Sequence, residues 1–492
     1  MHQPLLEQAQ RTPHAIALYT PDTTLTYQQL ADQIFANAKH LSALGIGAGD
    51  VVAILSHNTS TAVSMIFAIS ACGGVVLTLN TRLTGDELAY QLTLAEAKLL
   101  IIEDGLDVPP VAMPIIPIDV RAQHVAPLHT THAPSDTIYR VPTPIQTDNS
   151  PAVIMFTSGT SGKPKGAMLT HDNLFANAIA SHERLSMTQN DHWLCILPLY
   201  HIGGLSILIR CFMLGGCVSL LPKFDADAVH NVLCQRPITL ISLVPTMLYR
   251  LLDMDTHLWQ KSLRLILLGG ATADAPLMRR CADLGLPVAT TYGLTEASSQ
   301  VCTATPDATQ RKPASVGKPM PSITVRVVDE QGQNCLVGEI GEVAVRGKTV
   351  MAGYYKNPEA SAKTIRDGEL FTGDMGYLDA DGDLWIIQRR SDLIVTGGEN
   401  VYPAEIEAIV REIDGVRDVA VVGIPDAEWG QKVGCVLVAD VAIVSIKEVE
   451  AFLRGKLAGY KVPRVWKFAD ALPLNATGKV NRDAVRGMLL SD

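Results

Sequence analysis

Ten residues between positions 157 and 166 carry the strongest chemical pattern in the chain. They read Thr-Ser-Gly-Thr-Ser-Gly-Lys-Pro-Lys-Gly, with three glycines, four hydroxyl side chains and two lysines. Glycines let the backbone approach a ligand closely, and successive N–H groups, hydroxyls and ammonium groups suit the oxygens of a phosphate. The residues that we expect to contact phosphate are Thr157, Ser158, Gly159, Thr160, Ser161, Gly162, Lys163 and Lys165.

Two other interpretations of this loop fit less well. A Walker A loop, G-x-x-x-x-G-K-[ST], also cradles phosphate. Here, however, Pro164 follows Lys163 where Ser or Thr is required, and Thr157 stands in place of the first glycine. A surface linker of glycine and serine does not usually follow directly from an apolar segment such as 152–156, which predicts a buried strand.

Three further segments place polar or small residues at the ends of predicted strands. Residues 198–201 read Pro-Leu-Tyr-His, 267–271 read Leu-Leu-Gly-Gly-Ala, and 291–296 read Thr-Tyr-Gly-Leu-Thr-Glu. Mg²⁺ prefers carboxylate oxygen together with nucleotide phosphates, so Glu296 is a candidate ligand. Each segment also has an ordinary structural explanation. These are a core histidine at 201, a plain strand-to-helix turn, and a Thr-Glu helix cap.

Four more motifs lie toward the C-terminus. Residues 371–374 read Phe-Thr-Gly-Asp, and 388–392 read Gln-Arg-Arg-Ser-Asp. Residues 397–403 read Gly-Gly-Glu-Asn-Val-Tyr-Pro, and 472–479 end in Thr-Gly-Lys. A lysine near the end of a chain is usually a solvated surface group, so the last motif gains meaning only from the order of the whole set.

In this order, the motifs from 157 to 482 resemble those of the adenylate-forming acyl-CoA synthetases, a superfamily that includes luciferases and peptide-synthetase adenylation domains. The resemblance implies an enzyme that activates a carboxylic acid with ATP and Mg²⁺ as an acyl-adenylate and then transfers the acyl group to the thiol of coenzyme A. It also implies that a small C-terminal domain rotates between the two half-reactions.

The resemblance assigns a role to individual positions of this sequence. It implies Lys479, His201 and Glu296 as catalytic residues, with Glu296 as the metal ligand. Asp374 would accept the ribose hydroxyls, with Arg389 beside it, and Ser391 would be the hinge. Gln388 stands where Gly or Asp is more common, and Ser391 stands where the hinge more often has Asp or Lys and its usual polar contacts. The remaining nucleotide and coenzyme A positions are Gly269, Gly270, Ala271, Tyr292, Gly293, Thr295, Gly398, Glu399 and Asn400.

The superfamily motifs do not identify the acid. Beyond them, residues 201–205, 266–270, 315–319 and 389–407 resemble the o-succinylbenzoate–CoA ligases of menaquinone biosynthesis. That acid has two carboxylates, and only the aliphatic one is activated. Arg210 is the only charged residue between Asp191 and Lys223, so we expect it, with His201 and Gly270, to contact the acyl group. Alternatively, Arg210 extends from a helix to solvent.

Other substrates and functions stay open. A medium- or long-chain fatty acid–CoA ligase or an aryl acid–CoA ligase would share most of these stretches. A stand-alone adenylation domain would load a carrier protein instead of coenzyme A. An inactive homologue that acts as a binding module is a fourth possibility.

The elements that must position these motifs alternate between helical and strand patterns. From residue 5 to about 121, and again from 151 to about 300, this alternation predicts parallel sheets covered by helices. Short β-rich pieces from 301 to 390 predict antiparallel structure. We therefore expect an α/β N-terminal domain, residues 1–390, with two βα-layered subdomains and a small β-rich one. A small mobile α+β domain, residues 391–492, should follow.

Bulk composition narrows the class of protein. A net charge of −10 leaves no footprint of nucleic-acid binding. Two charge-poor stretches, 61–80 and 194–222, are interrupted by glycines and polar residues and should not span a membrane. Nine scattered cysteines and no evident signal peptide predict a cytoplasmic protein. The oligomeric state cannot be predicted.

Overall fold

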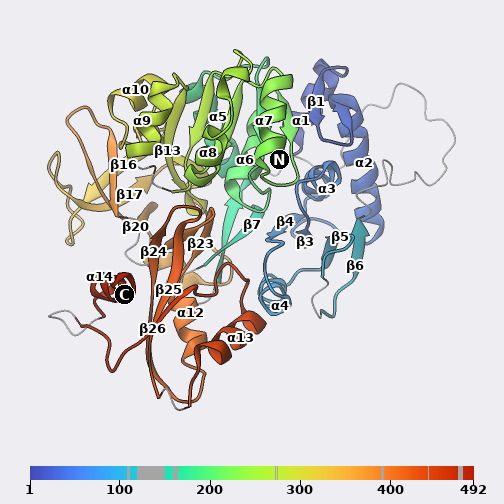
Figure 1. Ribbon diagram of the computed structural model, residues 1–492. Helices are drawn as coiled ribbons and strands as arrows, with labels where there is room; N and C mark the ends of the chain where they lie inside the picture. The colour runs from blue at the N-terminus through green and yellow to red at the C-terminus, as the bar shows by residue number, and fades with distance from the viewer. Residues whose placement is uncertain are drawn as a thin grey trace.

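The structure is a computed structural model. It describes residues 1–107, 111–118, 150–158, 164–271, 273, 275–388, 393–440, 443–474 and 480–491. The order of elements confirms the predicted α/β class, with a large N-terminal domain followed by a small C-terminal domain (Figure 1).

The first sheet has seven strands and carries the phosphate loop at its antiparallel end. Its order is β18-β8-β7-β4-β3-β5-β6, and the strands from β7 to β6 run parallel. Its strands are β3 (Val51–Leu55), β4 (Val75–Leu79), β5 (Leu99–Glu103), β6 (Ile115–Ile118), β7 (Pro151–Ser158), β8 (Pro164–Thr170) and β18 (Gly353–Tyr354). The helices among them are α2 (Tyr27–Ala43), α3 (Ser60–Ala71) and α4 (Gly85–Leu94).

The second sheet has nine strands, in the order β15-β14-β13-β12-β11-β9-β10-β1-β2. They are β1 (Ile16–Tyr19), β2 (Thr24–Thr26), β9 (His192–Cys195), β10 (Cys217–Leu220), β11 (Leu240–Leu243), β12 (Leu265–Leu268), β13 (Val288–Leu294), β14 (Ser299–Thr303) and β15 (Lys318–Pro319). Its helical elements are α1 (Gln3–Arg11), α5 (His171–Leu185), α6 (Ile202–Leu214), α7 (Ala226–Gln235), α8 (Pro245–Leu252), η1 (Thr256–Leu258), α9 (Ala275–Asp283), η2 (Thr295–Ala297) and α10 (Pro306–Arg311).

One hydrophobic core joins these two sheets. Phe67 of α3, Phe212 of α6 and Trp193 of β9 are fully buried in the same cluster. The rings of Phe67 and Phe212 lie 5.5 Å apart. Buried apolar strands with a helix between successive strands explain why the alternating pattern of the sequence predicted this architecture.

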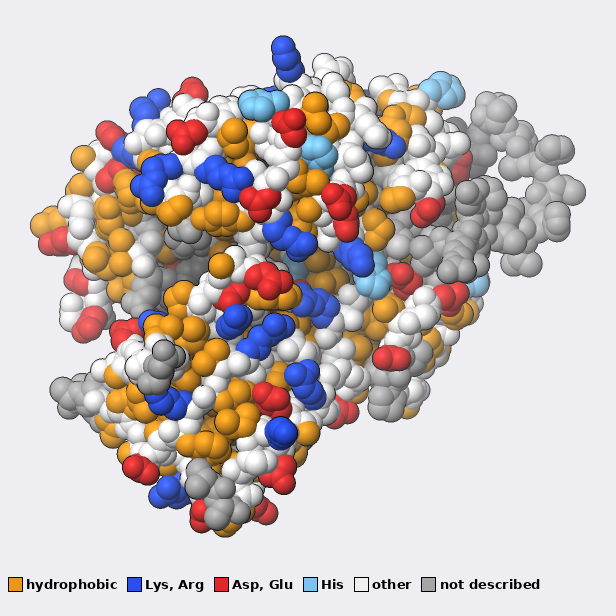
Figure 2. Space-filling view, in the orientation of Figure 1, with side chains coloured by type: hydrophobic (Ala, Val, Ile, Leu, Met, Phe, Trp, Pro, Cys, Tyr) orange, Lys and Arg blue, Asp and Glu red, His pale blue; other side chains and the backbone are white. Residues whose placement is uncertain are grey.

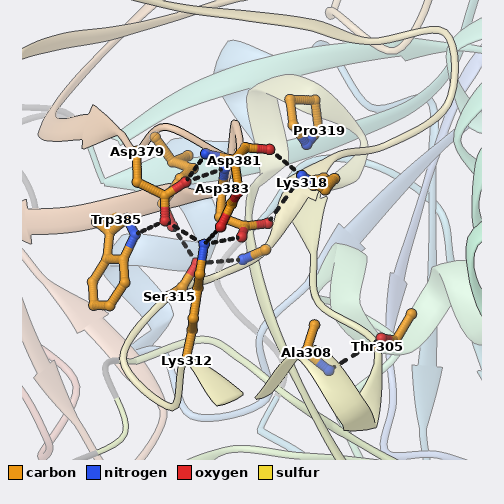
Figure 3. A network of polar contacts seen from close by, with 12 residues as sticks. Thr305, Ala308, Lys312, Ser315, Lys318, Pro319, Asp379, Asp381, Asp383 and Trp385 are labelled. Carbon is orange, nitrogen blue, oxygen red and sulfur yellow. Dashed lines mark hydrogen bonds and ion pairs between the residues drawn. The ribbon is translucent and has the colours of Figure 1, made fainter. Parts of the chain in front are cut away.

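The third sheet is antiparallel, as predicted for residues 301–390. Its strands are β16 (Thr324–Val328), β17 (Gly341–Arg346), β19 (Ile365–Arg366), β20 (Glu369–Leu378) and β21 (Leu384–Gln388), with α11 (Pro358–Thr364) beside them. The turn between β20 and β21 holds Asp379, Asp381 and Asp383. All three carboxylates accept hydrogen bonds from Lys312, which follows α10 (Figure 3).

The C-terminal domain has its own core and an α+β composition. Its strands are β22 (Ile394–Thr396), β23 (Glu399–Val401), β24 (Val416–Asp426), β25 (Gly430–Ala439) and β26 (Val465–Phe468). Its helices are α12 (Pro403–Val410), α13 (Ile446–Lys456) and α14 (Arg482–Leu490). The predicted boundary between residues 390 and 391 stays a prediction, because residues 389–392 lie outside the described part. No helix among the described residues is long and apolar enough to cross a bilayer.

Candidate active site

A cavity of about 660 Å³ lies where the N-terminal sheets meet the C-terminal domain. In Figure 2 the surface is hollowed between these two parts, and Lys and Arg side chains gather at the rim of the hollow. The predicted site residues that line the cavity are Thr157, His201, Arg210, Gly269, Gly270, Gly293, Thr295, Glu296, Asp374, Gly398, Glu399 and Asn400.

The strands that flank the predicted phosphate loop, β7 and β8, form an antiparallel pair. Thr157 pairs with Lys165 across the two antiparallel strands, and the Lys165 ammonium lies 5.3 Å from the centre of the Tyr354 ring. Ser158 ends β7. The remaining predicted phosphate contacts, Gly159, Thr160, Ser161, Gly162 and Lys163, lie outside the described residues, so their role stays a prediction.

Glu296 lies beside these two strands in the short turn η2. Its Oε1 accepts hydrogen bonds from Thr157 Oγ1, at 3.2 Å, and from the Tyr354 hydroxyl, at 2.9 Å. Its Oε2 has no hydrogen bond to a described residue. A carboxylate that is fixed through one oxygen, next to a phosphate loop, has the chemistry that Mg²⁺ requires. The residues present therefore fit the predicted metal.

Two glycines let strand ends approach one another behind the cavity. A Cβ on Gly293 would lie 1.8 Å from the carbonyl oxygen of Ser299, and a Cβ on Gly269 would lie 2.6 Å from Thr291 Cγ2. Gly270 has φ +80°, a conformation that favours glycine. Any other residue at Gly293 would separate β13 from β14 and displace Thr295 and Glu296.

Tyr292 and Asp374 form a buried pair at the predicted nucleotide site. The Tyr292 hydroxyl donates to Asp374 Oδ2 at 2.6 Å, and the Asp374 N–H donates to Thr372 Oγ1 at 3.1 Å. Asp374 lines the large cavity, whereas Tyr292 and Ala271 line a separate cavity of about 40 Å³. The structure thus brings these residues together from β13 and β20, while their contact with the nucleotide stays a prediction.

Arg210 is buried in the middle of α6, so the alternative that it extends to solvent is wrong. Only 1% of the residue is exposed. One terminal nitrogen donates to Asn177 Oδ1 at 3.0 Å and to Ser299 Oγ at 3.1 Å, and Nε has no partner among the described residues. Burial lowers the pKa of this guanidinium to about 9. No carboxylate of the described chain forms an ion pair with it.

The neighbours of Arg210 could not be predicted from the sequence. The guanidinium lies 5.7 Å from the centre of the Trp193 ring, and Asn177 also donates to the carbonyl of Gln300. Ser299 has φ +110°, which is rare for a residue with a side chain. Nothing in the local sequence signals this conformation, and the partners of Arg210 come from three separate elements, α5, β9 and β14.

The hairpin β22–β23 brings the predicted coenzyme A residues to the cavity. Gly398 has φ +84° and packs on Val244, at the start of α8. Glu399 Oε2 lies 3.2 Å from His201 Nε2, which connects this hairpin to the N-cap residue of α6. Burial acts to raise the pKa of Glu399, but His201 and Arg82 hold it below its ordinary value.

Three further predicted residues cannot be placed. Lys479, Arg389 and Ser391 lie outside the described residues, so their roles as catalytic lysine, ribose partner and hinge stay predictions. The described residues on either side of Lys479, Leu474 and Val480, form a β-bridge.

Comparison with family models decides the family. The model of the AMP-binding enzyme family matches residues 5–355, and that of the AMP-binding enzyme C-terminal domain matches residues 405–479. The chain belongs to the AMP-binding enzyme family.

Within this family, the chain is similar over its full length to ligases that act on one acid. The chain is 37% identical to a 2-succinylbenzoate–CoA ligase of Bacillus cereus (strain ATCC 10987 / NRS 248) over 489 residues, which is 99% of this chain and 98% of the relative.

Two solved structures of the o-succinylbenzoate CoA synthetase of Bacillus subtilis are also similar, each at 34% identity over 99% of this chain and 98% of the other. The TM-score is 0.90 for a double mutant bound with the product analogue OSB-NCoA. It is 0.73 for the complex with the acyl-adenylate intermediate OSB-AMP.

Proposed function

We propose that this AMP-binding enzyme is a 2-succinylbenzoate–CoA ligase of menaquinone biosynthesis. It would use ATP and Mg²⁺ to form an acyl-adenylate and would then form the coenzyme A thioester. Its relatives of the same length carry this activity in their names. A reaction that consumes ATP and coenzyme A also favours the cytoplasm as its location.

The observation that carries the choice of acid is the state of Arg210. The guanidinium is buried in the cavity wall with two neutral hydrogen-bond acceptors and no carboxylate partner among the described residues, which leaves positive charge to be balanced by a ligand. Burying a carboxylate without a partner costs several kcal/mol. A substrate with a second carboxylate therefore fits this wall, whereas a fatty acid would leave Arg210 unpaired.

In the first half-reaction, a carboxylate oxygen of the acid attacks the α-phosphorus of ATP and pyrophosphate leaves. Thr157, Lys165 and the loop between them would bind the β- and γ-phosphates, and Glu296 would hold the metal that neutralises their charge. Asp374 would fix the ribose. Lys479 would lie between the acid and the α-phosphate, where negative charge increases.

In the second half-reaction, the thiol of coenzyme A attacks the acyl carbon, a C–S bond forms and AMP leaves with the C–O bond electrons. Gly398, Glu399 and Asn400 line the same cavity as the predicted acyl site, so this hairpin would form the wall along which the thiol enters. Rotation about Ser391 would exchange Lys479 for this hairpin.

A substrate panel tests the proposal. ATP–pyrophosphate exchange is measured with o-succinylbenzoate, benzoate, a medium-chain and a long-chain fatty acid. Coenzyme A and a carrier protein are then offered as acceptors. We expect exchange to be fastest with o-succinylbenzoate and transfer to require coenzyme A. Preferential exchange with a fatty acid or a simple aryl acid would overturn the choice of substrate, and transfer to the carrier protein alone would overturn the acceptor.

A further inference from the structure

The start of helix α4 is in direct contact with the C-terminal domain. Lys461 Nζ lies 2.6 Å from Glu87 Oε1, on the N-terminal domain, and 2.8 Å from Glu405 Oε1, on the C-terminal domain. The side chains of Lys461, Glu87 and Glu405 are 4%, 8% and 6% exposed, so this cluster is shielded from water. Figure 1 shows α4 beside α13 at this contact.

Backbone groups complete the same contact. Glu87 Oε2 accepts from the N–H of Ala458 at 2.9 Å, and Thr84 Oγ1 donates to the carbonyl of Lys456 at 3.3 Å. Thr84 and Glu87 also form the capping box of α4, in which each side chain bonds the other residue's backbone N–H. The helix cap thus fixes the two side chains that face the C-terminal domain.

The loop before α4 adds a second charged contact. Arg82 NH1 donates to Glu399 Oε1 at 3.2 Å, and Asn80 Nδ2 donates to Glu399 Oε2 at 3.2 Å. The Arg82 guanidinium also lies 4.7 Å from the centre of the Tyr460 ring. Residues 80–87 therefore contact both the cavity hairpin and the segment around Lys461.

The charges of the buried cluster do not balance when the two domains are in contact. Within the C-terminal domain, Lys461 and Glu405 form a neutral pair, and Glu87 adds a second carboxylate. Burial, and then the nearby Glu87 charge, raise the pKa of Glu405, whereas Lys461 acts in the opposite direction. Glu405 Oε2 has no partner among the described residues. Such a cluster adds little net stability to the contact, because the cost of burying the second carboxylate opposes its attraction to Lys461.

Two structures of one relative differ in arrangement, because they match this chain with equal identity and coverage but with TM-scores of 0.90 and 0.73. This chain matches the arrangement found with a coenzyme A product analogue. The contacts of residues 80–87 are thus present in a chain whose overall structure is more similar to that complex than to the acyl-adenylate complex.

We propose that residues 80–87 are the docking surface of the C-terminal domain for thioester formation, with Glu87 as a positioning residue for that half-reaction alone. Glu87 does not line the cavity and touches no predicted substrate group. It acts through Lys461 and Ala458, which hold the domain that carries the β22–β23 hairpin. The inference rests on the two half-reactions of the proposed function, whichever acid is used.

The test is the variant Glu87→Gln, which keeps the shape and the cap acceptor but removes the charge that faces Lys461. Acyl-adenylate formation is measured by ATP–pyrophosphate exchange. Thioester formation is measured in a single turnover with isolated acyl-adenylate and coenzyme A. We expect thioester formation to slow by roughly tenfold, as a lost domain contact shifts the population, while exchange stays within about twofold.

Glu412→Gln is the matched control. Glu412 pairs with Lys456 within the C-terminal domain and is 55% exposed, so the same chemical change there should leave both half-reactions unaltered. A second variant, Glu405→Gln, leaves one carboxylate for Lys461 and should make thioester formation no slower than in the wild type. Equal slowing of both half-reactions by Glu87→Gln, or an effect as large in Glu412→Gln, would overturn the proposal.

The outcome is independent of the acid. If wild-type protein activates another acid instead of o-succinylbenzoate, the proposed substrate fails, and the same two half-reactions are compared with that acid. If Glu87→Gln loses neither half-reaction while o-succinylbenzoate is used, the docking surface fails and the substrate stands.

Discussion

Lys312 and Lys461 are each shared by several carboxylates, but they lie in regions of opposite character. Lys312 Nζ bonds Asp379, Asp381 and Asp383 at 2.6–2.7 Å, all from one turn of the N-terminal domain (Figure 3). Its side chain is 26% exposed, against 4% for Lys461. The first cluster joins neighbours inside a domain, and the second joins two domains.

The difference teaches what each cluster does. Three carboxylates separated by single residues would repel one another, and Lys312 offsets that charge while fixing the turn between β20 and β21 to α10. No motion between the domains changes those distances. At Lys461, one of the two carboxylates arrives only with domain contact. A contact that exists in one arrangement should affect one half-reaction, and a contact within a domain should affect both or neither.

Changing Lys479 gives the largest expected effect. It should slow acyl-adenylate formation and spare thioester formation, which is the opposite of the result expected for Glu87→Gln. Lys479→Ala removes the positive charge predicted beside the α-phosphate, so we expect ATP–pyrophosphate exchange to fall by about 10²–10³-fold. Supplied acyl-adenylate should still react with coenzyme A at close to the wild-type rate. Equal losses in both half-reactions would show that Lys479 acts in both domain arrangements, which contradicts its assignment to adenylation alone.

Changing Arg210 tests a contact that is fixed within the N-terminal domain. Arg210→Leu should lower kcat/KM for o-succinylbenzoate by about tenfold or more, because the second carboxylate loses its charged partner. Simple aryl acids should be used no worse. The measurement is ATP–pyrophosphate exchange with both acids.

Loss of activity with every acid would show that Arg210 supports the fold through Asn177 and Ser299. The thermal midpoint of the variant separates that outcome from a substrate effect. A lower midpoint with uniform loss indicates structure, and an unchanged midpoint with selective loss indicates recognition of the dicarboxylate.

Much of this architecture could be predicted because its signals are local. Thr26 and Gln29 form a capping box at the start of α2. The backbone of Ser299 lies so close to Gly293 that only glycine fits at that position. Apolar strands alternating with helices likewise predicted the two βα sheets. In each case the physical cause lies within a few residues of the pattern.

The charged clusters could not be predicted, because their partners are distant in sequence. Glu87 and Lys461 are 374 residues apart, and Arg210 and Ser299 are 89 residues apart. A glutamate at the third position of a helix signals a cap and gives no sign of a second partner. The burial of Arg210 likewise depends on three elements that meet only in the folded chain.

Lys312→Met should affect stability and leave the two half-reactions in their wild-type ratio. Without the ammonium, the Asp379–Asp383 turn keeps three carboxylates within reach of one another and loses its contact with α10. We expect the thermal midpoint to fall by about 2–4 °C. Lys363→Met, at an exposed pair with Glu359 on α11, is the control and should change it less. A changed ratio of half-reactions would mean that the turn takes part in domain motion.

The two clusters should also differ in their response to pH. Burial acts to raise the pKa of Asp379, but Lys312 and Trp385 outweigh it and hold the pKa well below the ordinary value. Ionised Asp379 therefore stabilises the fold at every pH above the ordinary aspartate pKa, and this stabilisation is lost only as the pH falls below that value. The thermal midpoint should show no change from this cluster between pH 8 and 5.5. Glu405 has a raised pKa in the docked arrangement and binds its proton more tightly there. Docking should therefore gain as the pH falls and weaken as the pH rises through that pKa.

The thiolate fraction of coenzyme A also rises with pH, so the useful quantity is the ratio of wild-type to Glu405→Gln rates for thioester formation. The glutamine carries no charge at any pH and resembles the protonated glutamate. We expect a ratio of about one-half well above the pKa of Glu405 that rises toward one as the pH falls through that pKa, because only a charged Glu405 beside Glu87 opposes docking. A ratio that stays constant would mean that Glu405 keeps its charge, shared with Lys461, throughout the pH range measured. Lys461 alone would then offset the negative charges of Glu87 and Glu405, as Lys312 offsets those of its three aspartates.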